Sequence, residues 1–209
     1  MATIEEIKKK LSTLSTYPEE LGLKLEKPED RLKWLLAAIL FSRRISVQIA
    51  KRTYGEFEAQ GITSPERIIG AGWERLVELL DAGGYVRYDF STASNLLSLA
   101  ENLRSKYDSL EGLYSQAKDS QDLEKKLQEF KGVGPTTVSI FLRELRGLWE
   151  KARPQVSPLA QQAAARLGLG KELQGDPELE PRLVKLQLEF CKKRRCPSCP
   201  VKEFCQEKR

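Results

Sequence analysis

The chain has 209 residues, enough for one domain or two small ones, and its 35 lysines and arginines exceed its 30 acids to give a net charge of +5. It contains no histidine, which excludes a histidine general base, a Cys-His dyad and histidine metal ligands. The N-terminal segment lacks the apolar core of a signal peptide, and no apolar run reaches the roughly 18 residues of a membrane span. We therefore expect a cytoplasmic protein without membrane association.

Apolar residues recur at helical spacing along nearly the whole chain, and no segment shows the sustained alternation of a strand. The expected fold class is therefore all-α. Pro28 and Asp30 mark the start of a particularly hydrophobic helix, because proline fits a first helical turn and an acid suits the positive helix end. The expected helices cover residues 3–14, 29–41, 44–59, 64–69, 73–80, 91–105, 121–130, 135–146, 157–167 and 178–190.

A glycine-rich turn separates two of these helices at residues 130–135, which read FKGVGP. Gly132 and Gly134 permit positive φ and leave backbone amides uncovered. Pro135 suits the first position of the next helix, where no amide proton is required, and Val133 can point inward as an apolar plug. Amides at a helix N-terminus bind phosphate without needing any side chain.

The flanks of this turn strengthen the interpretation. Thr136 and Thr137 offer hydroxyl donors beside the amides, and apolar residues at helical spacing lie on both sides. The pattern is that of a helix-hairpin-helix element that binds DNA. The alternative is an ordinary tight turn between two core helices.

The last nineteen residues contain all four cysteines of the chain, in the spacing C-x4-C-x2-C-x5-C: Cys191, Cys196, Cys199 and Cys205. In a reducing cytoplasm structural disulfides are not expected, so the pattern indicates a metal centre. Four thiolates suit either a 4Fe–4S cluster or a tetrahedral zinc ion. Four consecutive cations separate the first two cysteines: Lys192, Lys193, Arg194 and Arg195.

The glycine hairpin, the Arg-Gly turn at 146–147, the segment LLAAILFSRRISVQIAKR at 35–52 and the four-cysteine loop together resemble the endonuclease III superfamily of DNA repair glycosylases. The resemblance implies a six-helix domain over 27–150 that carries the hairpin. It also implies a discontinuous domain, from 1–26 and 151–209, that carries a 4Fe–4S cluster. DNA would lie in the groove between the domains, with the target nucleotide flipped out of the stack.

The resemblance favours the cluster over zinc, although the first interval has four residues where the family usually has six. A cluster would hold the basic run in a rigid loop, where it can contact phosphate rather than remain a solvated face. The composition, rich in lysine and glutamate with a single methionine, resembles that of proteins from hot environments.

The catalytic residues of the family are missing from this chain. Thr136 occupies the place of the lysine that forms a Schiff base, and Ser157 occupies the place of the aspartate. No acid is present from 151 to 170, nor from 32 to 55 where adenine-specific relatives have a glutamate. A lysine-dependent abasic-site lyase is therefore not expected. Asp89, Glu144 and Glu150 are weak candidate substitutes, and their interpretation as surface or salt-bridge acids is favoured over a catalytic one.

Two loops are expected to probe the duplex, because the family places its intercalating residues there. In the early loop, Arg44 can reach an orphaned base or a phosphate, while its neighbour Arg43 can do so or pair with an acid. In the second loop, at 83–90, Tyr85 and Tyr88 can stack on bases and Arg87 can reach phosphate. The alternative is that both tyrosines cap the domain core.

The sequence thus predicts a monomeric, nucleoid-associated protein that binds double-stranded DNA and recognises damaged or mismatched bases. Three hypotheses remain open: a glycosylase with relocated catalytic groups, a catalytically inactive lesion or structure binder, and a cluster-bearing factor with a general DNA-binding or redox-sensing role.

Overall fold

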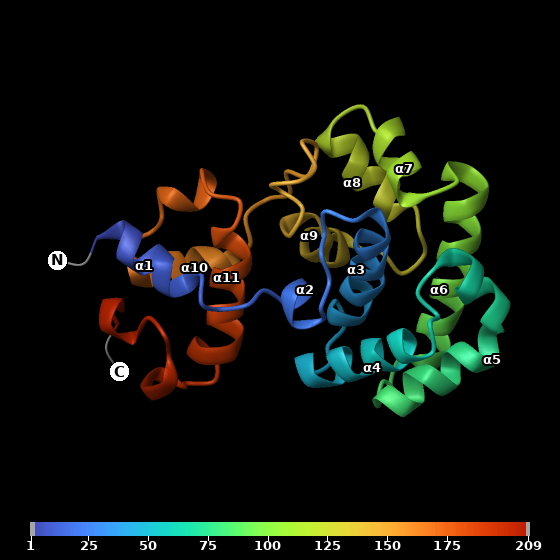
Figure 1. Ribbon diagram of the computed structural model, residues 1–209, viewed down its shortest axis with the longest axis horizontal. Helices are drawn as coiled ribbons and strands as arrows, with labels where there is room; N and C mark the ends of the chain where they lie inside the picture. Colours follow the sequence, from blue (N-terminus) through green and yellow to red (C-terminus); the bar gives the residue numbers. More distant parts are fainter. Residues whose placement is uncertain (1–2, 208–209) are drawn as a thin grey trace. The chain divides into compact units, whose positions relative to one another are not determined.

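The computed structural model describes residues 3–207, and this part of the chain is built from helices and loops without any strand (Figure 1). The expected all-α class is confirmed. The chain forms two compact units. The central unit is Leu23–Leu142, and the terminal unit combines Met1–Gly22 with Arg143–Arg209. No helix within residues 3–207 is long and apolar enough to cross a membrane.

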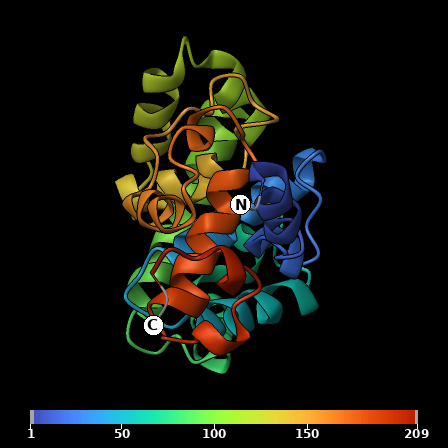
Figure 2. The ribbon, with the colours of Figure 1, turned by 90° about the vertical axis from the view of Figure 1, so that its left-hand side faces the viewer.

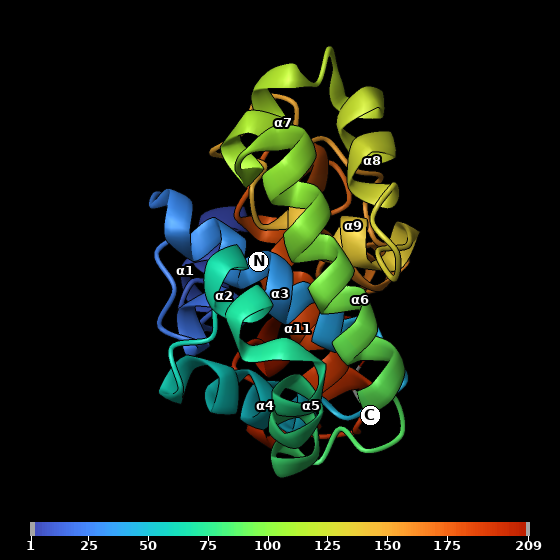
Figure 3. The ribbon, with the colours of Figure 1, turned by 90° about the vertical axis from the view of Figure 1, so that its right-hand side faces the viewer.

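The central unit is a bundle of consecutive helices. In chain order they are α3 (Pro28–Phe41), α4 (Val47–Ala59), α5 (Pro65–Gly83), α6 (Asp89–Asn102) with a π-helical turn (Leu103–Tyr107), α7 (Leu110–Gln116), α8 (Ser120–Gln128) and α9 (Pro135–Arg143). Figure 3 shows α5 next to α6, and within residues 3–207 no other two elements contact each other more extensively. Serine caps begin α4 and α5, where Ser46 and Ser64 accept hydrogen bonds from amides three residues ahead.

The centre of this bundle is the apolar helix α3. The Trp34 side chain is fully buried, and its Nε1 donates to the Phe141 carbonyl oxygen at 3.3 Å, which joins α3 to α9. Arg31 on the same helix is buried and donates to the Leu25 carbonyl and to Glu111 on α7. The helix that follows the glycine hairpin is therefore anchored to the core of the unit.

The terminal unit has its own core. Its elements are α1 (Ile4–Leu11), α2 (Tyr17–Glu20), α10 (Pro158–Leu167), α11 (Leu179–Leu186), a π-helical turn (Gln187–Cys191) and short 3-10 turns at Glu172–Gln174, Cys196–Ser198 and Lys202–Phe204. Ile7 and Leu11 of α1 pack with apolar residues of α10 and α11, and Val201 of the C-terminal loop joins the same cluster. Figure 2 shows the blue N-terminal segment beside these orange and red helices.

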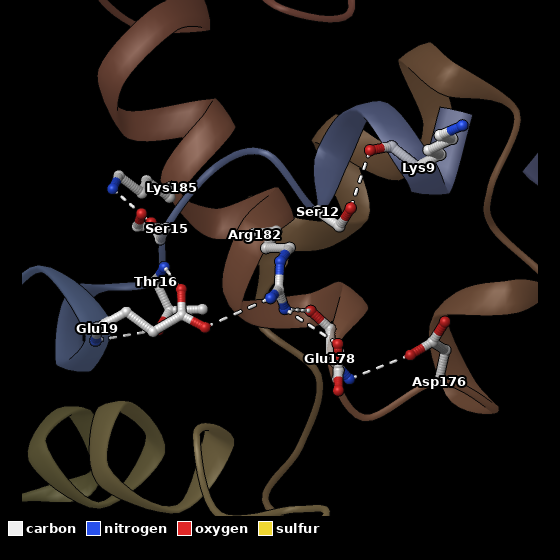
Figure 4. A network of polar contacts seen from close by, with 9 residues as sticks. All are labelled: Lys9, Ser12, Ser15, Thr16, Glu19, Asp176, Glu178, Arg182 and Lys185. Carbon is white, nitrogen blue, oxygen red and sulfur yellow. Dashed lines mark hydrogen bonds and ion pairs between the residues drawn. The ribbon is translucent and has the colours of Figure 1, made fainter. Parts of the chain in front are cut away.

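Polar contacts tie the N-terminal segment to α11 (Figure 4). Arg182 contacts Glu19 on α2 and Glu178 at the start of α11, each at 3.5 Å. Lys185 donates to the Ser15 carbonyl and pairs with Glu20 at 2.5 Å. These links hold segments that are more than 150 residues apart in sequence in a single unit.

Several helix boundaries differ from the sequence expectations. The first helix ends at Leu11 because Ser12 forms its C-cap, and the second long helix begins only at Val47, which leaves Arg44 in a loop. The expected break between 69 and 73 is present as a kink at Gly72, whose φ is +74°. The helix expected over 178–190 changes from α to π after Leu186.

Two short helices, α2 and α7, were not expected from the sequence. Neither is long enough to display a full apolar repeat, so their caps are the better signal. Thr16 and Glu19 form a capping box at α2, and Ser109 accepts from the Gly112 amide at α7.

Candidate nucleic-acid interface and metal centre

The hairpin between α8 and α9 has the geometry that its glycines suggest. Gly132 has a φ of +88°, in the left-handed region that favours glycine. The Val133 amide donates to the Phe130 carbonyl at 3.0 Å, and the Val133 side chain is buried. The expected apolar plug is confirmed.

Gly134 has a different role from Gly132. Its φ is not positive, so of the two glycines that permit a left-handed conformation only Gly132 adopts it. Its carbonyl accepts from the Val138 amide at 3.0 Å and so opens α9, and a Cβ added at Gly134 would meet no atom within 4 Å. The absence of a side chain leaves open space beside the first amides of α9, which have no carbonyl partner within the helix.

The two threonines after the hairpin are unlike each other. Thr136 is exposed, whereas Thr137 is buried, so only Thr136 can add a hydroxyl to a ligand at the hairpin. Lys131, on the other side of the turn, is also exposed. The hairpin thus presents backbone amides, one hydroxyl and one cation, which suits a phosphate oxygen.

Alanine substitutions should separate the two glycines. At Gly132 a Cβ would lie 2.4 Å from the Asn95 Nδ2 atom and would force an L-residue into positive φ, so we expect Gly132→Ala to lower the free energy of unfolding by about 1–3 kcal/mol. Gly134→Ala is the matched control and should change it by less than about 0.5 kcal/mol. Urea unfolding of both variants measures the two free energies of unfolding. Equal values would contradict the left-handed, closely packed conformation at Gly132.

The early loop, residues 42–46, presents one free cation and one that is partly buried. Arg44 is exposed, as a DNA-contacting side chain must be. Arg43 does not form the ion pair considered from the sequence: its buried Nε finds no acceptor within residues 3–207. Its guanidinium lies over the Tyr88 ring, 5.9 Å from the centroid.

The second loop corrects one expectation. Tyr85 is fully buried and its hydroxyl donates to the Leu40 carbonyl at 3.0 Å, so it cannot stack on a base and instead joins this loop to α3. Burial also raises the pKa of Tyr85. Tyr88 is half-buried, with the guanidinium of exposed Arg87 5.4 Å from its centroid. Tyr88 and Arg87 keep accessible surface, whereas Tyr85 does not.

A carboxylate missed in the sequence lies beside Ser157. Glu180 on α11 accepts from the Ser157 amide at 2.9 Å and from the Arg146 Nε at 2.8 Å. Ser157 itself caps α10 by accepting from the Leu159 amide. The Glu180 side chain is only 1% exposed, and both of its carboxylate oxygens accept hydrogen bonds. It therefore holds the segment before α10 in place and does not face a substrate.

Of the three acids considered as catalytic substitutes, Glu150 is exposed, and Asp89 and Glu144 lie in different environments. Asp89 begins α6, where its Oδ1 accepts from the Phe90 amide at 2.7 Å. It lies close to Asp81, whose pKa is raised by burial and by the hydrogen bond and charge of Asp89. Glu144 has a side chain that is 3% exposed, next to the Arg143 guanidinium with an Nε–Oε1 distance of 3.4 Å. Burial raises the pKa of Glu144 to about 7, against the opposing effect of Arg143.

The raised pKa of Glu144 predicts a pH dependence of stability. Because the folded state binds this proton more tightly than the unfolded state, the contribution is complete below the ordinary pKa of 4.5 and is lost as pH rises to about 7. We expect a loss on the order of 1–3 kcal/mol across that range. Glu144→Gln should flatten this slope in urea unfolding between pH 5 and 7, and an unchanged slope would contradict the assignment.

The four cysteines meet at one cavity in the terminal unit. They line a space of about 240 Å³ together with Phe190, Pro197, Lys202 and Glu207, and none forms a disulfide. Burial raises the pKa of the Cys191 and Cys199 thiols, and the Arg166 guanidinium opposes this at Cys191. Within residues 3–207, no three or more cysteine or acidic side chains lie close enough together to hold a metal ion as they stand.

Arg166 on α10 ties the cysteine loop together. Its Nη1 donates to the Gln187 Oε1 at 2.9 Å, its Nε pairs with Glu207 at 3.1 Å, and its carbonyl accepts from the Gln206 amide at 2.9 Å. These contacts fix both ends of the loop to α10. No sequence motif pointed to this arginine.

The basic run within the loop is exposed at all four positions: Lys192, Lys193, Arg194 and Arg195. Lys193 pairs with Glu189 at 2.5 Å, and Arg194 has a left-handed φ of +54°. The tight turn at Arg194 leaves these cations on the surface, where they can meet a polyanion.

No family model matches the sequence, and no curated protein matches it. Among solved structures, one similar chain is an endonuclease III described as a trapped covalent intermediate with DNA, in an estranged-adenine complex. It is 18% identical, the match covers 100% of this chain and 98% of that chain, and the TM-score is 0.50. The chain therefore has an endonuclease III-like fold over its full length, and the resemblance based on motifs is confirmed for the fold.

Proposed function

We propose that this chain binds double-stranded DNA as a base-excision-repair-type protein that recognises damaged or mismatched bases. The observation that carries the proposal is the hairpin. Gly132 turns the chain in a left-handed conformation, Val133 plugs the core, and Gly134 leaves open space at the start of α9. The endonuclease III-like fold supports the same use, because the similar structure is a complex with DNA.

The four cysteines are proposed to hold a 4Fe–4S cluster. They fit such a group because all four thiols face one cavity, none is oxidised to a disulfide, and no histidine competes as a ligand. When bound, the cluster supplies cross-links between loop segments and so stabilises the terminal unit. Zinc is the alternative for four thiolates, and iron and acid-labile sulfide analysis separates the two.

The lysine-dependent lyase reaction is not part of the proposal. Thr136 is exposed at the start of α9, but a hydroxyl cannot form a Schiff base. The carboxylate nearest Ser157 in this structure, Glu180, is sealed by its bonds to Arg146 and to the Ser157 amide. The Glu144 carboxyl is likewise buried beside Arg143.

The engagement of these acids favours a second candidate function, a recogniser that binds lesions without cutting them. The candidate acids left with exposed surface are Asp89, at the start of α6, and Glu150. A glycosylase would have to use one of these two or release Glu144 by a rearrangement.

The test is a single-turnover incubation with duplexes that carry uracil, mismatched thymine, oxidised or alkylated bases, or an abasic site. Released base and strand nicks are measured separately, and borohydride is added to trap Schiff bases. We expect lesion-selective binding without a trapped covalent complex. Base release that is lost in Asp89→Asn or Glu144→Gln would identify an enzyme with relocated chemistry. Binding without lesion preference would refute the recognition proposal.

A further inference from the structure

Two large aromatic side chains of the central unit are exposed in contact with each other. Trp73 on α5 is 36% exposed and Phe90 at the start of α6 is 60% exposed. Their ring centroids are 5.4 Å apart and the ring planes are inclined by 42°. Among residues 3–207 these are the only tryptophan or phenylalanine side chains that are exposed rather than partly or fully buried, so they form the most accessible aromatic surface of the described chain.

The pair is held in place by polar contacts rather than by burial. The Trp73 Nε1 donates to the Ser94 Oγ at 3.0 Å, and that hydroxyl donates to the Phe90 carbonyl at 2.9 Å. The kink at Gly72 directly precedes Trp73. A fixed aromatic surface loses little side-chain entropy when a flat ligand binds to it.

The same part of α6 also supports the hairpin. The backbone at Gly132 packs so closely against Asn95 that an added Cβ would lie 2.4 Å from its Nδ2 atom. Asn95 directly follows Ser94, which holds Trp73. Two adjacent residues of α6 therefore position the proposed phosphate site and the aromatic pair.

The charges around the pair indicate which part of a nucleic acid fits it. Asp89 precedes Phe90, Glu74 follows Trp73, and Glu74 is exposed. These acids adjoin the two ring-bearing residues and disfavour a phosphate directly at the rings, but leave an uncharged base unaffected. Of the nearby cations, Arg75 pairs with Glu78, and exposed Arg87 lies three residues before Phe90. Lys131 is exposed on the hairpin, where a phosphate is attracted. The backbone of a bound strand is thus favoured at the hairpin and its base at the rings.

We propose that Trp73 and Phe90 form a stacking platform for an unpaired base in the strand whose phosphate is bound by the hairpin; this rests on the proposed DNA binding. Every base has an apolar face that stacks on aromatic rings, so the platform selects an unpaired base without selecting its identity. Base–aromatic stacking of this kind typically changes affinity by roughly tenfold to hundredfold when the ring is removed.

The test uses the fluorescence of Trp73 in the full chain. Trp34 and Trp149 are buried, so Trp73 is the tryptophan that a ligand can reach. The protein is titrated with a duplex containing one bulged base and with the same duplex fully paired. We expect the bulged duplex to quench the emission and the paired duplex to leave it nearly unchanged. Trp73→Phe should remove the quenching while keeping binding within about threefold.

Affinity measurements on variants complete the test. Phe90→Ala should weaken binding of the bulged duplex about tenfold and leave the paired duplex unchanged, whereas Leu148→Ala, another exposed apolar site, should change neither. Hairpin-dependent binding that Phe90→Ala does not affect, or equal quenching by both duplexes, would overturn the platform and leave the proposed function standing. If neither duplex binds the wild-type chain, both proposals fail.

Discussion

Replacing Gly134 by arginine is expected to lower DNA affinity by roughly tenfold to hundredfold while leaving the fold intact. The side chain would occupy the open space beside the first amides of α9, where the phosphate is proposed to lie. Hydrogen bonds to a charged group contribute roughly 1.5–3 kcal/mol each, so losing one or two explains this magnitude. Arginine is the informative choice, because its positive charge alone would raise affinity for a polyanion.

The matched control is Gly55→Arg on α4. Gly55 is exposed, also has no atom within 4 Å of an added Cβ, and belongs to the same unit, so it adds the same charge and bulk away from the hairpin. Fluorescence anisotropy with a labelled duplex gives both affinities, and circular dichroism verifies the helical content. Equal affinity for the Gly134→Arg and Gly55→Arg variants would exclude the hairpin as a phosphate site.

Cys196→Ser is expected to abolish the iron-sulfur absorbance and to destabilise the terminal unit. Cys191 and Cys199 pack against the apolar cluster of that unit and Val201 belongs to it, so a loop that loses its centre exposes part of this core. Binding of a structural metal supplies on the order of 10 kcal/mol in the smallest metal-dependent domains. We expect a smaller loss here, because α1, α10 and α11 retain a core without the loop.

The measurement is the absorbance spectrum, the iron and sulfide content and the thermal unfolding of the purified variant beside the wild type. Ser198→Ala is the control, because Ser198 lies in the same loop, is exposed and carries no sulfur. An iron-free Cys196→Ser protein that unfolds at the wild-type temperature would refute a structural role for the cluster. Wild-type protein that contains zinc without iron would replace the cluster by the zinc alternative.

Local signals in the sequence were sufficient to predict most of the fold. Apolar periodicity and proline near the first helical position located the long helices, and the FKGVGP segment located the hairpin. Sequence spacing did not separate Gly132 from Gly134, since both read as flexible glycines. The structure distinguishes them by the positive φ of Gly132 and by the packing of Asn95 against it.

Contacts between distant residues could not be predicted in this way. Glu180 reaches Ser157 across 23 positions, and no periodic pattern connects the two. Trp73 and Phe90 are likewise brought together only by the pairing of α5 with α6. Tyr85 was misplaced because a tyrosine in a glycine-containing loop resembles a surface residue, whereas its hydroxyl finds a partner in the buried Leu40 carbonyl.

The most direct test of the central claim is the affinity of the wild-type chain for a lesion-bearing duplex in competition with the identical undamaged duplex at fixed salt. Salt is fixed because phosphate contacts make every affinity depend on it. Our account predicts tighter binding of at least one lesion duplex by about tenfold or more, and loss of that binding in Gly134→Arg. Equal affinity for damaged and undamaged duplexes across the panel, or binding that is insensitive to the hairpin substitution, would contradict it.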